Sequence, residues 1–194
     1  LKQAVGVDIE GVPARRTFFG FRNDKWKRWT MHDGLEVLVS EDFNTTTDSN
    51  GDILIHPQGD TSVAASGRMP KGGYFFDSIV RQGEIDEAAL DPEDNLEEFG
   101  PLAERALDEI QHDIGAAAAT GRAVFASFGG TAFGDIAHVP GAGLKHPKGI
   151  RDIAEWYMSL RARTDYVHQV FSKQCEIALD NLARIHGRIG NSLD

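Results

Sequence analysis

The sequence predicts an α/β fold whose first third is rich in β-strands. Short strand-like runs and turns fill that first third, helical periodicity begins near residue 101, and a continuous apolar run at 122–128 lies between helical segments. A run without polar alternation suits a parallel strand that is buried on both faces. A buried strand between helices is typical of the α/β class. The chain has 194 residues, 41% of them apolar, which suffices for one domain with a hydrophobic core.

Turn signals divide the first third into short strands. A strand is expected at 7–12. The dipeptide Asp33-Gly34 then separates two strand-like runs within 29–39, which is the strongest short-range signal for a β-hairpin. A second turn precedes a short strand at 53–55. This part of the chain is therefore expected to be a set of hairpins.

The stretch between the hairpins and the first helix is expected to be irregular. Residues 58–73 are rich in glycine and predict a loop, and the aromatic run 74–80 predicts a strand or the floor of a lid. Residues 83–100 are acidic and poor in hydrophobic side chains, so they are expected to cross the surface.

Three helices are expected in the second half of the chain. Pro101 suits the first position of a helix, and apolar residues then recur at helical spacing: Leu102, Ala106, Ile110 and Ile114. A second helix is expected at 150–162 and a third at 165–189, with Asp165 as its N-cap. The third carries an apolar stripe composed of Val167, Val170, Phe171, Ala178, Leu182, Ile185 and Ile189.

Charge and composition exclude several classes of function. Thirty acidic and twenty basic residues give a formal net charge of −10, which repels phosphate backbones and anionic membranes, so we expect no nucleic-acid or membrane partner. No apolar run is long enough for a membrane helix, and the first residues lack the layout of a signal peptide. The single cysteine, Cys175, rules out an internal disulfide and suits a reducing compartment. The sequence therefore predicts a cytoplasmic protein.

Several segments resemble one known family. The run 128–137, Phe-Gly-Gly-Thr-Ala-Phe-Gly-Asp-Ile-Ala, resembles the third-strand region of the uroporphyrinogen decarboxylase superfamily, and 1–9 resembles its earlier step from helix to strand. The helix that opens at Asp165-Tyr166-Val167 resembles the one before that family's next strand. The resemblance covers nearly all of the chain and is greatest to bacterial uroporphyrinogen-decarboxylase-like proteins, including the corrinoid-dependent methyltransferase branch.

The resemblance implies a partial (β/α)8 barrel, the TIM-barrel fold of that superfamily. Complete barrels typically have about 250 residues. Only about three barrel strands are found here, at 7–12, at 122–128 and beginning at 191. We therefore expect a single incomplete barrel domain over 1–194, equivalent to the amino-terminal portion of the family, with a β-rich insertion at 20–82.

The resemblance leaves three functions open. For the parent enzyme we favour zinc-dependent methyl transfer between a corrinoid and a thiol, with a small-molecule substrate and a corrinoid protein as partners. Uroporphyrinogen decarboxylation, a step of porphyrin (haem) biosynthesis, is the alternative. Ala132, Phe133 and His138 stand where the decarboxylases carry Pro-Trp and a tyrosine, and Arg15 stands for an acidic residue. A non-catalytic or truncated product, which would self-associate through exposed strands, is the third.

Candidate substrate-binding residues follow from the ends of the barrel strands. In such barrels the carboxyl ends of the strands face the active site, which selects a first group: Ser127, Phe128, Gly129, Gly130 and Asp135. Gly129-Gly130 could equally make a plain turn, and Asp135 could cap one. Arg15 and Arg16 could hold an anionic substrate, or be a solvated basic pair. His138 precedes a glycine-rich stretch that could form a lid, or is an ordinary loop histidine. No catalytic residue and no metal ligand is assigned within this chain; zinc and a corrinoid would belong to the parent protein.

Overall fold

The computed structural model describes residues 4–12, 14–128 and 139–190. The chain divides into two compact units. The first consists of Leu1–Ala14, Phe99–Gly134 and Phe171–Asp194, and the second consists of Arg15–Glu98 and Asp135–Val170. The described residues form eight β-strands in three sheets and three α-helices, and no closed barrel is present among them. The predicted α/β class is confirmed.

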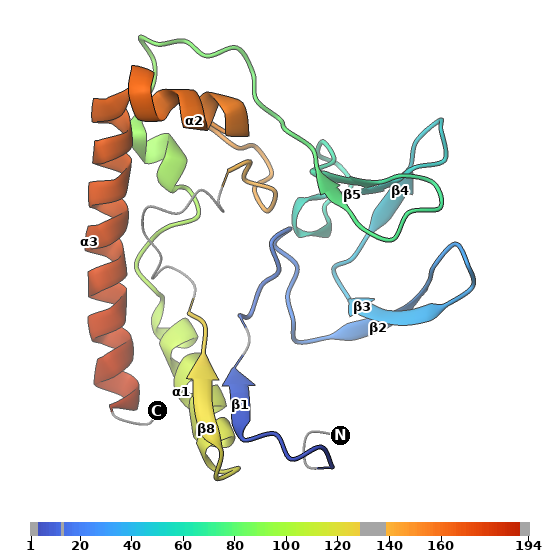
Figure 1. The fold of residues 1–194 in the computed structure, drawn as a ribbon, viewed down its shortest axis with the longest axis vertical. Helices are drawn as coiled ribbons and strands as arrows, with labels where there is room; N and C mark the ends of the chain where they lie inside the picture. Colours follow the sequence, from blue (N-terminus) through green and yellow to red (C-terminus); the bar gives the residue numbers. More distant parts are fainter. Residues whose placement is uncertain (1–3, 13, 129–138, 191–194) are drawn as a thin grey trace. The chain divides into compact units, whose positions relative to one another are not determined.

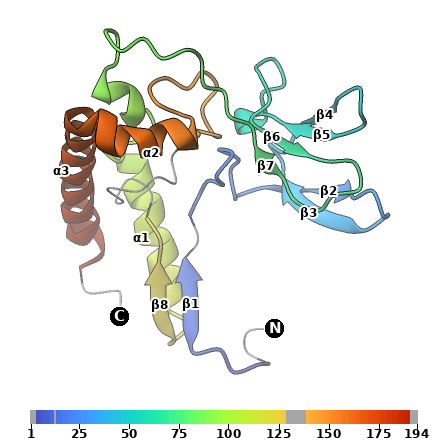
Figure 2. The same cartoon turned by 45° about the horizontal axis from the view of Figure 1, so that its top comes forward.

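The first unit contains a pair of parallel strands. Strand β1 (Ile9–Val12) pairs with β8 (Ala123–Ala126), and Ile9 lies opposite Ala123. Figures 1 and 2 show the two arrows side by side and pointing the same way. Helix α1 (Glu104–Ala118) precedes β8 in the chain and contacts both strands. Two predicted strands and the helix between them therefore form one βαβ arrangement.

Helix α3 (Thr164–Ile189) begins in the second unit and ends in the first, where it is linked to α1 and to the segment before it. The buried Asn181 accepts a hydrogen bond from the backbone N–H of Leu102 at 2.8 Å and donates one to the carbonyl of Gly100 at 2.9 Å. Arg184 and Arg188 both pair with Glu104. The predicted stripe is confirmed at Val167, Val170, Ala178 and Ile185, which are buried, but Leu182 is exposed; the buried line includes the polar residues Gln174 and Asn181 instead.

One expectation for β8 is wrong. Its continuous apolar run predicts burial on both faces, but only Val124 is buried, while Phe125 on the opposite face is 69% exposed. On β1, Ile9 is likewise 56% exposed. Side chains alternate between the faces of a strand, and α1 covers only one face of this pair. An apolar run indicates that both faces of a strand are suitable for burial, but it does not indicate which elements pack against each face.

The second unit contains the predicted hairpins. Strands β2 (Trp26–Thr30) and β3 (Glu36–Ser40) pair antiparallel around the Asp33-Gly34 turn, where Gly34 has φ of +86°. A second antiparallel sheet contains four strands in sequence order: β4 (Thr45–Thr47), β5 (Ile53–Ile55), β6 (Gly67–Met69) and β7 (Asp77–Ser78). The strand at 53–55 is confirmed. β6 lies within the expected loop at 58–73, and only two residues of the expected strand at 74–80 join the sheet.

Aromatic rings pack between the hairpin and the second sheet. Phe43 is at the centre: its ring lies 5.2 Å from that of Trp29, 5.8 Å from that of Phe21 and 5.8 Å from that of Phe76, in edge-to-face arrangements. Such pairs contribute about 0.5–1.5 kcal/mol each beyond their buried area. By contrast, Phe75 extends into solvent at 83% exposure. The aromatic residues 74–76 precede β7 and are not part of a strand.

The remaining elements of the second unit are helical. Two 3₁₀ turns, η1 (Pro57–Gly59) and η2 (Pro92–Leu96), precede helix α2 (Ile153–Ala162). Helix α3 starts at Thr164, so Asp165 lies in its first turn and is not its N-cap. Of the helices in the described part of the chain, none combines the length and apolar character that crossing a membrane requires. The expected strand at 191 lies outside the described residues.

Alanine substitutions at two glycines distinguish the cost of a strained backbone from the cost of a steric clash. Gly34 and Gly59 both have positive φ, but a Cβ at Gly34 would have nothing within 4 Å, whereas one at Gly59 would lie 2.0 Å from the carbonyl oxygen of Asp42. We predict that Gly34→Ala lowers the free energy of unfolding by about 1 kcal/mol, through the cost of left-handed backbone alone. Gly59→Ala should lower it by a further ~1–3 kcal/mol because the backbone must shift. Equal destabilisation of the two variants in urea denaturation would contradict the close contact.

Candidate functional site

The predicted site at the end of β8 is described only in part. Ser127 is exposed and its backbone N–H donates to the carbonyl of Val12 at 3.3 Å, which extends the parallel pairing by one residue. Phe128 follows and is half-buried. The other predicted residues of this group, Gly129, Gly130, Asp135 and His138, lie outside the described residues. Their role in substrate binding stays a prediction.

The predicted basic pair begins the second unit. Arg16 donates from Nη1 to the carbonyl of Gly20 at 3.0 Å, and the carbonyl of Arg15 accepts from the backbone N–H of Asn23 at 2.9 Å. Both arginines are exposed. The guanidinium of Arg16 thus stabilises the turn that follows it. Binding of an anionic substrate by this pair stays a prediction.

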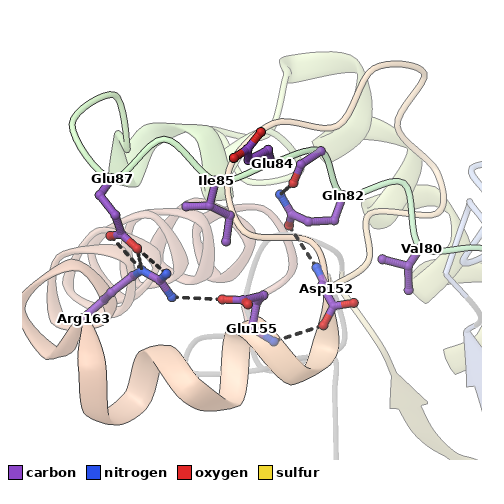
Figure 3. Close-up of a pocket in the computed structure, with 9 residues that line it drawn as sticks. Val80, Gln82, Glu84, Ile85, Glu87, Asp152, Glu155 and Arg163 are labelled. Atoms are coloured by element: carbon purple, nitrogen blue, oxygen red, sulfur yellow. Dashed lines mark hydrogen bonds and ion pairs between the residues drawn. The ribbon is translucent and has the colours of Figure 1, made fainter.

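A pocket in the second unit brings together residues that the sequence analysis did not select. Its volume is 530 Å³. Figure 3 shows the side chains around it, which come from the segment before η2, from α2 with its cap, and from the residue after α2. The lining residues are Val80, Gln82, Gly83, Glu84, Ile85, Glu87, Asp152, Glu155 and Arg163.

Gln82 and Asp152 form one wall of the pocket. The side-chain oxygen of Gln82 accepts from the backbone N–H groups of Arg151 and Asp152, the latter at 3.0 Å. The carboxylate of Asp152 accepts from the backbone N–H of Glu155 at 3.0 Å, which makes Asp152 the N-cap of α2. Both side chains are held by backbone groups, so this wall is fixed by the start of the helix.

An ionic chain forms the opposite wall. The Nε atom of Arg163 lies 2.9 Å from each carboxylate oxygen of Glu87, and its Nη1 lies 3.2 Å from Glu155 and 3.0 Å from the hydroxyl of Ser159. Hydrogen bonding to Arg163 lowers the pKa of Glu87, and hydrogen bonding to Glu87 raises the pKa of Arg163. The two side chains therefore stay ionised together around neutral pH.

The charge of the pocket limits what it can bind. The lining residues carry four carboxylates, those of Glu84, Glu87, Asp152 and Glu155, and a single guanidinium. This balance disfavours an anion in the pocket and suits a cationic group. Among residues 4–12, 14–128 and 139–190, no three His, Cys, Asp or Glu side chains lie together in a way that could hold a metal ion. Cys175 lies on α3, half-buried. The described residues thus do not form a zinc site.

A buried arginine fixes the segments behind the pocket. Arg151 is 1% exposed, and its Nη1 lies 2.9 Å and 3.1 Å from the two carboxylate oxygens of Glu98. Its Nε donates to the carbonyl of Lys148 at 2.6 Å and its Nη2 to that of Asp94 at 2.8 Å. A buried cation is tolerated when its donors are matched in this way. Arg151 is also the residue whose backbone N–H binds Gln82.

Beside Arg151 lies a buried polar group centred on Asn95. Its side chain exchanges two hydrogen bonds with the backbone of Ile150, at 2.8 and 2.7 Å, and accepts a third from the hydroxyl of Tyr166 at 2.7 Å. Burial, followed by the nearby charge of Asp94, raises the pKa of Tyr166 to about 12. The hydroxyl therefore remains a proton donor, and it ties the first turns of α3 to η2.

The expectation that residues 83–100 cross the surface is confirmed for most of the segment but is wrong at Asn95 and Leu96. Asn95 and Leu96 are buried, and Glu98 is the main partner of Arg151. The sequence contained an indication of this packing, because the acidic stretch 83–100 is complementary in charge to a later basic stretch, 145–163. Besides His146, that later stretch has five basic residues: Lys145, Lys148, Arg151, Arg161 and Arg163. Composition alone does not predict which acidic residue of one stretch forms an ion pair with which basic residue of the other.

Comparison with known proteins adds no relative. No family model matches the chain, and no match is found among curated proteins or solved structures. The function of the chain must therefore be inferred from its own residues.

The ionic wall gives a testable titration. Because the pKa of Glu87 is lowered from its ordinary value of 4.5, its pairing with Arg163 stabilises the fold above that value and is lost as the pH falls through the lowered pKa. We predict that Arg163→Gln returns the pKa of Glu87 towards 4.5, measured by carboxyl carbon NMR. Arg161→Gln, at an exposed position two residues earlier, should leave the pKa unchanged. An identical Glu87 titration in the wild type and in Arg163→Gln would refute the pairing.

Proposed function

We propose that this chain is part of a uroporphyrinogen-decarboxylase-like barrel enzyme that acts on a small molecule, and that the parent enzyme transfers a methyl group between a corrinoid and a thiol. One observation carries the barrel part of the proposal. The β1 and β8 strands are parallel, α1 covers one face of the pair, and the opposite face presents Ile9 and Phe125 to solvent. Parallel sheets occur almost only with both faces covered.

A barrel accounts for this asymmetry. In a (β/α)8 barrel the helices cover the outer face of each strand, and side chains from the other strands fill the inner face. Ile9 and Phe125 would then belong to the barrel interior. Ser127 and Phe128 follow the carboxyl end of β8 and would lie at the mouth, where such enzymes bind their substrates.

The choice of methyl transfer rests on the resemblance and on the departures from the decarboxylase pattern at Ala132, Phe133, His138 and Arg15. The described residues do not provide a zinc site. Zinc ligands, and the surface that docks a corrinoid protein, would therefore come from other segments of the parent. The residues of this chain would bind and orient the substrate.

The exposed sheet face predicts self-association of the isolated chain. Burying two large apolar side chains is favourable by about 1.5–3 kcal/mol each, and parallel strands with free edges can pair with another copy. We predict that the double variant Ile9→Thr/Phe125→Thr shifts the chain towards monomer in sedimentation velocity. The matched variant Leu38→Thr, on the hairpin at 67% exposure, should not. A wild-type chain that is monomeric at high concentration would contradict the incomplete-sheet interpretation.

The reaction is tested on the whole protein that contains this chain. We expect methylcobalamin to be consumed with formation of a thioether from a small thiol, and uroporphyrinogen to remain unchanged. Ser127→Ala should lower kcat/KM by about tenfold if its hydroxyl binds the substrate, whereas Ser172→Ala, on the exposed side of α3, should not. Release of carbon dioxide from uroporphyrinogen would establish the alternative reaction, and the absence of both activities would overturn the proposal.

A further inference from the structure

The segment 141–151 in the second unit contains three basic side chains, each with an acidic partner. Arg151 pairs with Glu98 at 2.9 Å, Lys145 pairs with Asp60 at 2.6 Å, and Lys148 lies 4.0 Å from Asp94. In a chain with a net charge of −10 such neutralisation is expected. One basic residue at this segment, Arg81, departs from it.

Arg81 binds the segment only through backbone carbonyls. Its Nη2 donates to Gly141 at 2.7 Å and its Nη1 to Lys145 at 3.3 Å. Its Nε is buried, and the described residues offer it no hydrogen-bond acceptor. Within the same residues no carboxylate forms an ion pair with Arg81. A guanidinium has five N–H groups, so most of its donor capacity is unused.

The surroundings make this cation costly. Arg81 is half-buried, and burial together with the neighbouring charge of Arg151 lowers its pKa. An arginine nonetheless remains protonated at neutral pH. Charged groups in such positions are normally paired, and a buried polar group without a partner calls for an explanation such as a bound ion. Glu98 forms its ion pair with Arg151, through both of its carboxylate oxygens.

We propose that Arg81 is an anion-binding residue that receives an acidic group of a ligand, either a carboxylate or a phosphate. Arginine suits this role because its planar guanidinium can hold either group through two parallel hydrogen bonds. The adjacent backbone is compact: a Cβ at Gly141 would lie 3.1 Å from Nη1 of Arg151. Arg81 is not among the residues that line the acidic pocket. The inference does not depend on the proposed reaction.

Binding of simple anions tests the proposal. Inorganic phosphate and succinate are titrated separately into the chain at constant ionic strength with chloride as the balancing ion, and the Nε–Hε resonance of Arg81 is followed by NMR. We expect a saturable shift with at least one anion. Saturation by phosphate alone assigns a phosphate group, and saturation by succinate assigns a carboxylate. No saturable shift with either anion would overturn the proposal.

Three variants show whether Arg81 itself is responsible, with binding followed by isothermal titration calorimetry. Arg81→Gln should weaken binding by about tenfold or more, since hydrogen bonds to charged groups contribute about 1.5–3 kcal/mol. Arg81→Lys keeps the charge without the planar guanidinium and should bind the anion with intermediate affinity. If Arg81→Gln does not fold, the affinity of Arg81→Lys shows whether Arg81 binds the anion. Arg161→Gln removes an exposed arginine and should bind as the wild type does. Undiminished binding in a folded Arg81 variant would refute the assignment.

Discussion

The buried guanidinium of Arg151 is the interaction on which the second unit depends. It joins Glu98 and the carbonyl of Asp94 to the carbonyl of Lys148, across more than fifty residues of sequence. A charge at 1% exposure must have its donors matched, and losing one partner of such a pair costs about 3–5 kcal/mol. Through its backbone N–H it also holds Gln82, and with it the wall of the acidic pocket.

This constraint places two sites of opposite charge near one another. The pocket collects carboxylates around a single arginine, Arg163, whereas Arg81 has a like-charged neighbour and no acid of its own among the described residues. Both sites lie on the segment 80–87 or directly against it. Acidic side chains thus gather at the pocket, while Arg81, next to two of its lining residues in the sequence, has a buried nitrogen without an acceptor among the described residues.

The first unit presents a different physical problem. Its βαβ arrangement buries one face of two parallel strands under α1 and leaves Ile9 and Phe125 exposed on the other. An exposed apolar face of this kind is unfavourable in water and favours association with further strands. The barrel proposed above would remove that exposure by placing both side chains in its interior. The proposed substrate-binding residues at the end of β8 would then be surrounded by other strands of the barrel, which are not among the described residues.

The features that the sequence predicted are those determined by interactions between residues close together in the chain. The Asp33-Gly34 turn specifies its own hairpin because positive φ and short strands are encoded within a dozen residues, and apolar periodicity marks α1 and α3. The sequence did not reveal the pairing of Arg151 with Glu98, the isolation of Arg81, or the exposure of Phe125. Each depends on which distant segments meet, and that is decided by the combined packing of the chain: a composition rich in both charges permits many ion pairs, and only the tertiary structure selects among them.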